Sequence, residues 1–184
     1  MEVLLISGKA GHGKDTFAEI LQDNFTIQGY KVLTIHFADL VKEFARLYYG
    51  WAGNKDVEGR ALLQYIGTDL MRKYDADYWA RIVGEFLAAA DKDFNVAIIP
   101  DNRFENEIEV VKHYCPQTKT IRVQRWTTEN EPYINPILTN AQLNHPSETS
   151  LDNYTFDYLI NNYEGQQEVL IKAANGIIED LTKK

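Results

Sequence analysis

The chain has 184 residues, which predicts one domain, and 45% of them are hydrophobic, which is enough for a sizeable core. Its net charge of -8 argues against a protein that binds nucleic acid non-specifically, because such binding requires a basic face. The single cysteine, Cys115, excludes an internal disulfide and fits a reducing compartment. Neither a membrane span nor the charged start of a signal peptide is visible, so we expect a soluble cytoplasmic protein.

Short apolar runs alternate along the chain with segments of helical periodicity, the pattern of an α/β fold with a mostly parallel sheet. The expected strands are residues 2–7, 31–37, 95–100, 118–125 and 157–161. The expected helices are one that ends at Gly29, followed by residues 38–49, 60–73, 77–91, 105–114 and 166–182. Together they predict a three-layer sandwich around a five-stranded sheet, with residues 1–184 forming a single domain.

A glycine-rich loop follows the first strand and leads into a helix. It reads Gly8, Lys9, Ala10, Gly11, His12, Gly13, Lys14, Asp15 and Thr16. This is the context of a phosphate-binding P-loop, in which backbone N–H groups and the helix start hold phosphates while the lysine adds a full charge. We therefore predict that the loop binds ATP and that Lys14 is catalytic. His12 is expected to be a spacer whose side chain points outward.

An acidic residue, Asp15, follows the lysine where a P-loop ordinarily has Ser or Thr, and Thr16 supplies a hydroxyl one position later. A carboxylate beside a polyphosphate repels it unless a cation lies between them. Asp15 and Thr16 are thus candidate ligands of Mg²⁺, directly or through water. The alternative is that an acidic residue simply suits the first turn of a helix.

Residues 50–92 are interpreted as a helical insert that binds the acceptor. Polar side chains recur at every fourth position of the helix expected there and form one stripe: Arg60, Gln64, Thr68 and Arg72. Gly67 adjoins this stripe and leaves room for a ligand. The pattern fits the wall of a substrate pocket, and a solvated helix face has the same pattern.

Asp101 and Arg103 come directly after the buried run that ends at Pro100. Ligands of open parallel sheets bind beyond the carboxyl ends of the strands, where the P-loop also lies. An acid there suits Mg²⁺ or its water, and an arginine suits a phosphate, so both are predicted to be catalytic. The alternatives are a helix cap for Asp101 and a surface ion pair for Arg103.

The pattern weakens between residues 126 and 154, which are interpreted as a segment that covers the active site like a lid. The alternative is a surface excursion that packs on the core. This segment contains no Lys or Arg, so Arg125, just before it, is predicted to supply catalytic charge, with Lys9 as a further cation. His145 and Glu148 are expected to cap or anchor the loop.

Several of these motifs together resemble the phage-type deoxynucleoside monophosphate kinases. The resemblance extends from the N-terminus to about residue 162 and is carried by residues 8–16, 36–39, 63–68, 77–79, 99–107 and 145–148. It implies an adenylate-kinase-like P-loop fold that transfers the γ-phosphoryl group of ATP, with Mg²⁺, to a deoxynucleoside monophosphate. A phage-encoded enzyme of this type would act in the host cytoplasm.

The same resemblance implies roles for individual residues. Arg103 would bind the phosphate of the acceptor, and the base and sugar would be bordered by Phe37, Gln64, Tyr78 and Trp79. The expected partners are small nucleotides, not nucleic acid or a membrane. The sequence leaves open a P-loop kinase for another acceptor, such as dephospho-coenzyme A or phosphomevalonate, and a non-catalytic nucleotide-binding module. It also leaves open which bases are accepted and whether two copies form a homodimer.

Overall fold

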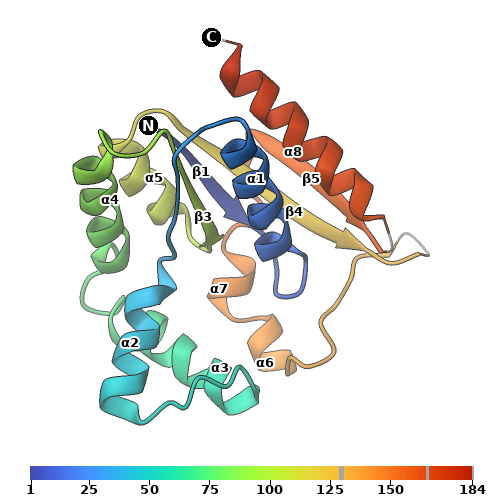
Figure 1. Ribbon diagram of the computed structural model, residues 1–184. Coiled ribbons are helices and arrows are strands. Elements are labelled where there is room, and N and C mark those ends of the chain that lie inside the picture. Colours follow the sequence, from blue (N-terminus) through green and yellow to red (C-terminus); the bar gives the residue numbers. More distant parts are fainter. Residues whose placement is uncertain (129–130, 165, 184) are drawn as a thin grey trace.

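The computed structural model describes residues 1–128, 131–164 and 166–183. Its central sheet contains five parallel strands in the order β2-β3-β1-β4-β5. Their bounds are β1 (Glu2–Ser7), β2 (Val32–Thr34), β3 (Val96–Asn102), β4 (Thr118–Trp126) and β5 (Tyr158–Tyr163). Helices cover both faces of this sheet, which confirms the predicted α/β sandwich (Figure 1).

The helices form three groups. Helices α1 (Lys14–Ile27) and α8 (Gln167–Thr182) cover one face of the sheet, and α4 (Tyr78–Ala90) and α5 (Glu105–Tyr114) cover the other. The remaining helical segments gather near the carboxyl ends of the strands (Figure 1). They are α2 (Ala38–Tyr49), α3 (Val57–Gln64), the π-helix η1 (Tyr65–Leu70), α6 (Asn140–Leu143) and α7 (Pro146–Thr149).

Strand β1 explains why the first apolar run has no polar interruption. Its alternate side chains enter two different cores: Leu4 and Ile6 pack with α1 and α8, whereas Val3 and Leu5 pack with α4 and α5. All four side chains are completely buried. A strand in the middle of a parallel sheet needs apolar residues on both faces, which a continuous run supplies.

A third, smaller core joins the insert to α2. It contains Val41 and Ala45 from α2, Ile66 from η1 and Trp79 from α4. These side chains pack with one another and form a cluster separate from the two that line the sheet. The insert and α2 therefore pack together beside the ends of the strands.

The prediction of one helix over residues 60–73 was wrong in two respects. The helix begins earlier, because the side chain of Asp56 accepts a hydrogen bond from Gly59 N at 2.8 Å and caps α3. After Gln64 it continues as a π-helix, in which Trp79 Nε1 donates to Gly67 O at 3.1 Å. Glycine has a low helix propensity, and a carbonyl bonded from outside favours such local rewinding.

Strand boundaries near the carboxyl edge also differ from the prediction. Strand β2 ends at Thr34 because the chain then turns toward β3. Strand β3 continues past Pro100 to Asn102, with a register shift between Leu5 and Ser7 of the neighbouring strand. Proline has no N–H to donate to a ladder, which accounts for an irregularity at this point.

The predicted irregular segment 126–154 contains two short helices, α6 and α7. Residues 129–130 of this segment lie outside the described residues. No helix in the described ranges is long and apolar enough to cross a membrane.

Candidate active site

The glycine loop joins β1 to α1 and takes a backbone path that side chains would obstruct. Gly13, the N-cap of α1, has a φ of 92°, and a Cβ there would lie 2.6 Å from Asn162 Nδ2. A Cβ at Gly8 would lie 2.4 Å from Val123 O. Both positions therefore require glycine, because any larger residue would displace a neighbouring strand or strain the loop.

Lys14, the first residue of α1, lies under the loop that precedes it. Its Nζ donates to Lys9 O at 3.0 Å, so the side chain spans the loop. Burial, followed by the nearby charge of Arg103, lowers the pKa of Lys14 from 10.5 to about 7. An anion in the loop would reverse this effect because it favours the ammonium form.

We expect the binding of an ATP analogue to take up protons through Lys14. With a pKa of about 7, roughly nine in ten Lys14 side chains are neutral at pH 8 and about one in ten at pH 6. A bound triphosphate recharges them, so affinity falls as the pH rises through 7. Calorimetry at pH 8 in two buffers of different ionisation enthalpy measures the uptake as a difference in binding enthalpy.

The matched control for this titration is Lys14→Arg, whose guanidinium stays charged at pH 8 and takes up no proton. Equal binding enthalpies of the wild type in the two buffers at pH 8 would contradict the prediction.

A cavity of about 470 Å³ opens beside the loop, between the carboxyl ends of the strands and the insert. Ala10, Gly11, Lys14 and Asp15 contribute the wall on the side of the P-loop. The opposite wall contains the whole polar stripe and its glycine: Arg60, Gln64, Gly67, Thr68 and Arg72. The stripe thus faces the cavity, although α3 and η1 replace the single helix expected there.

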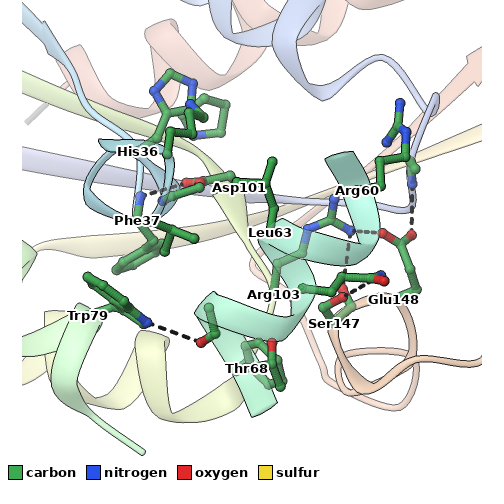
Figure 2. Close-up of a pocket in the computed structure, with 18 of the residues that line it drawn as sticks. His36, Phe37, Arg60, Leu63, Thr68, Trp79, Asp101, Arg103, Ser147 and Glu148 are labelled. Carbon is green, nitrogen blue, oxygen red and sulfur yellow. Dashed lines mark hydrogen bonds and ion pairs between the residues drawn. The ribbon is translucent and has the colours of Figure 1, made fainter. Parts of the chain in front are cut away.

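Apolar side chains form another part of the cavity wall (Figure 2). Phe37 and Trp79 lie there together with Val41 and Leu63. Trp79 is almost completely buried, and its indole N–H is occupied by Gly67 O, so the side chain adds apolar surface rather than a free donor to the wall. Such a surface suits an aromatic base.

Arg103 lies just beyond β3, and its side chain points toward Ser147 and Glu148 of α7 (Figure 2). Its Nη1 donates to Glu148 Oε1 at 2.7 Å, to Ser147 O at 3.2 Å and to Gly8 O at 3.3 Å. The ion pair expected as the alternative for Arg103 therefore exists, but its partner is Glu148, on the cavity wall rather than on the outer surface.

Glu107, which sequence reasoning missed, holds the backbone around Arg103. Its Oε2 accepts from Arg103 N at 2.7 Å, from Phe104 N at 3.0 Å and from Asn102 Nδ2 at 3.0 Å. Burial raises the pKa of Glu107, while Arg72 opposes that rise. Its position in the first turn of α5 was the available signal, because an acid there bonds the free N–H groups of a helix start.

Arg72 is the ion-pair partner of Glu107, and its guanidinium lies 4.0 Å from the centre of the Phe104 ring. It lines the cavity but is held by these contacts. If Arg72 contacts the substrate as predicted, its guanidinium would have to bind the substrate and Glu107 at the same time.

Asp101 also lines the cavity, with both carboxylate oxygens engaged. Oδ1 accepts from Phe37 N at 3.0 Å and Oδ2 from Ala38 N at 2.9 Å. The alternative interpretation expected Asp101 to cap the helix that follows β3. Asp101 instead binds the first N–H groups of α2. Asp101 thereby fixes Phe37 in the cavity wall.

His12 corrects the expectation of an outward-pointing spacer. Its side chain is buried: Nδ1 accepts from Arg125 N at 3.1 Å, and Nε2 lies 3.1 Å from Tyr133 O. These partners require a neutral ring with the proton on Nε2. Burial lowers the pKa of His12 to about 4, so the ring is neutral at physiological pH. His12 therefore anchors the loop to the end of β4.

Gly8 and Gly13 of the loop are not among the residues that line the cavity, and neither are the predicted residues Lys9, Thr16, Tyr78 and Arg125. Arg125 pairs with Glu164 and stacks over Tyr133, and Lys9 pairs with Asp152. Thr16 is exposed on α1, and Tyr78 packs edge-on against Trp79. The structure does not bring these side chains together with Lys14 and Arg103.

Further cavity residues were not predicted to belong to the site. They are His36, Ala38, Lys42, Lys55, Pro100, Phe104, Leu138, Ser147 and Glu148. All of them except Lys42, Lys55 and Leu138 lie in segments that carry the resemblance to the kinases, and Glu148 was expected only to cap or anchor the loop. His145 does cap α7, because its Nδ1 accepts from Ser147 N at 3.2 Å.

The fold is that of the P-loop kinases. Similar solved structures include a sugar kinase from Janibacter sp. HTCC2649, with 16% identity and a TM-score of 0.56 over 97% of this chain and 95% of that chain. Another is APS kinase from Mycobacterium tuberculosis in complex with AMPPNP and APS, with 9% identity and a TM-score of 0.52 over 98% of this chain and 96% of that chain. Comparison with curated proteins gives no match.

A family model described as deoxynucleotide monophosphate kinase matches residues 51–172. The chain belongs to this family and is a nucleotide kinase. The match includes the insert, Asp101, Arg103 and the segment with α6 and α7, and it begins after the P-loop.

Proposed function

We propose that the protein transfers the γ-phosphoryl group of ATP to the phosphate of a deoxynucleoside monophosphate, giving the diphosphate. The observation that carries this proposal is that the phosphate loop with Lys14 and the polar wall with Arg103 share one cavity. Two phosphate-binding elements on one cavity suit a reaction between two anionic substrates.

The donor side of the proposed reaction is the loop around Lys14. Backbone N–H groups of the loop other than those of Ala10 and His12, which already have protein partners, would hold the β- and γ-phosphates, and the Lys14 ammonium would neutralise part of their charge. Lys14 is already buried beneath the loop and bonded to Lys9 O, so it needs little reorganisation.

The acceptor side is the wall formed by the insert and Arg103. Three of the five N–H groups of Arg103, those on Nε and Nη2, have no protein partner among the described residues and are free for a phosphate. Phe37 and Trp79 offer the base a flat apolar surface, and Gln64 and Thr68 offer hydrogen-bonding groups.

Magnesium fits the residues on this wall. Asp15 and Asp101 both line the cavity, and carboxylate oxygens are ligands that Mg²⁺ prefers. In kinases such a cation, when bound, neutralises charge on the bridged phosphates. Asp15 is exposed and the more accessible candidate, since Asp101 already caps α2.

The transfer itself breaks the bond between the γ-phosphorus and the bridging oxygen of ADP and forms a bond to an oxygen of the acceptor phosphate. That oxygen already carries negative charge, so no strong general base is required. Positioning and charge neutralisation then supply most of the rate. Lys14 and Arg103 are the cations placed to do this.

The substrate class is tested by measuring ADP release with ATP, Mg²⁺ and a panel of acceptors. We expect release that depends on one or more of the common deoxynucleoside monophosphates. The panel also contains the ribonucleotides, dephospho-coenzyme A and phosphomevalonate. Release confined to the last two acceptors would contradict the proposal. ATP binding without release for any acceptor would favour a non-catalytic nucleotide-binding module.

A further inference from the structure

Glu148 connects the two halves of the proposed site. It lies in α7, and its carboxylate points into the cavity between the phosphate loop and Arg103 (Figure 2). Oε2 accepts from Ala10 N at 2.9 Å, and Oε1 accepts from Arg103 Nη1 at 2.7 Å. Its side chain is only 7% exposed, and the charges of Lys14 and Arg122 also interact with it.

The turn that carries Glu148 is fixed from several sides. Ser147 O accepts from Arg103 at 3.2 Å, and Gln64 Nε2 lies 3.5 Å from Ser147 Oγ on the opposite wall. Leu151, just after α7, is buried in the core between the sheet and α4 and α5. The segment that carries Glu148 is therefore held by Arg103, by the opposite wall of the cavity and by the core, and these contacts restrict the position of Glu148.

A carboxylate in this place is electrostatically unfavourable for binding phosphates. It lies beside the loop and the arginine that the anionic substrates need, and like charges at such distances repel. Its presence is understandable if it acts on geometry, since an ion pair with additional hydrogen bonds restricts a long arginine side chain.

We propose that Glu148 is a positioning residue that holds Arg103 in place for the acceptor phosphate and ties its position to the phosphate loop. This inference rests on the proposed function. Glu148 occupies Nη1, whereas Nε and Nη2 have no protein partner among the described residues and remain available for a phosphate. The acceptor oxygen then lies close to the γ-phosphate, because Glu148 binds both Arg103 and Ala10.

The test is Glu148→Gln, which keeps the shape of the side chain. The carboxamide loses the charge, and its NH₂ group faces one of the two donors, so one of the two hydrogen bonds is lost. We expect kcat to fall about tenfold or more, because a misplaced reacting group is costly. The KM of the acceptor is expected to stay unchanged or to fall, because a repelling charge is removed.

The matched control is Asp75→Asn, the same change at an exposed ion pair with Arg81 outside the cavity wall. It is expected to leave both constants unchanged. A Glu148→Gln kcat within twofold of the wild type would overturn the inference. So would a loss that appears wholly as weaker binding of an ATP analogue, measured by calorimetry.

A double-mutant cycle separates positioning from a merely structural role. If Glu148 acts through Arg103, adding Glu148→Gln to Arg103→Ala lowers kcat little further. Additive losses would contradict the inference. If Glu148→Gln does not fold, Glu148→Asp replaces it, since the shorter side chain keeps the charge but cannot reach both partners, and the same loss of kcat is expected.

The wild type is assayed first, so that a failure of the proposed function can be distinguished from a failure of the role proposed for Glu148. No release of ADP with any deoxynucleoside monophosphate would overturn the proposed function and this inference together. Normal release by the wild type combined with an unaltered Glu148→Gln variant would overturn the role of Glu148 alone.

Discussion

Replacing Lys14 with alanine is expected to lower kcat by about 10³-fold or more, because a preorganised cation at the transferred phosphoryl group is lost. The fold should survive. Lys14 is buried with one hydrogen bond, and burial together with Arg103 disfavours its charged form, so its removal costs little stability. ADP release with a deoxynucleoside monophosphate measures the effect, and thermal melting followed by circular dichroism checks the fold.

The control for this variant is Lys172→Ala, an exposed lysine on α8, which should have the activity of the wild type. If well-folded Lys14→Ala kept turnover within a few-fold of the wild type, the proposed role of the phosphate loop would be wrong.

Arg103→Ala is expected to reduce kcat/KM for the acceptor by about 10²- to 10³-fold, since it removes the cation proposed to hold the acceptor's phosphate. The affinity for an ATP analogue should change little. The melting temperature should fall, because Glu148 is left buried without its ion-pair partner. Steady-state kinetics with each substrate varied in turn, together with calorimetry, separates these effects.

Arg103→Lys keeps the charge but loses the planar fork, so it should recover stability better than activity. Unaltered acceptor kinetics in Arg103→Ala would remove Arg103 from the proposed site. A loss confined to the binding of ATP would assign Arg103 to the donor instead.

Apolar runs, glycine positions and residue spacing predicted much of this fold, because these features depend on interactions between residues that are close in the sequence. The buried strand β1 was visible as an apolar run, and the loop that follows it was visible because its glycines are required by the backbone path. The four-residue spacing of Arg60 and Gln64 was recognised in spite of a wrong helix boundary, since side chains four apart share a face.

What sequence reasoning missed depends on contacts between distant segments. Glu148 meets Ala10 across 138 positions, and His12 meets Arg125 across 113. In the π-helix, Gly67 O accepts a hydrogen bond from Trp79, a residue of another helix. Periodicity and spacing describe residues that are close in the sequence, so they cannot reveal contacts between residues that are far apart in it.

The small core of Val41, Ala45, Ile66 and Trp79 packs the insert against α2 and forms a cluster separate from the two cores that line the sheet. Substitutions that reshape the wall beside Trp79 therefore disturb few of the contacts on which the loop depends. This separation makes acceptor preference open to evolutionary change or redesign while the machinery for handling phosphate is retained.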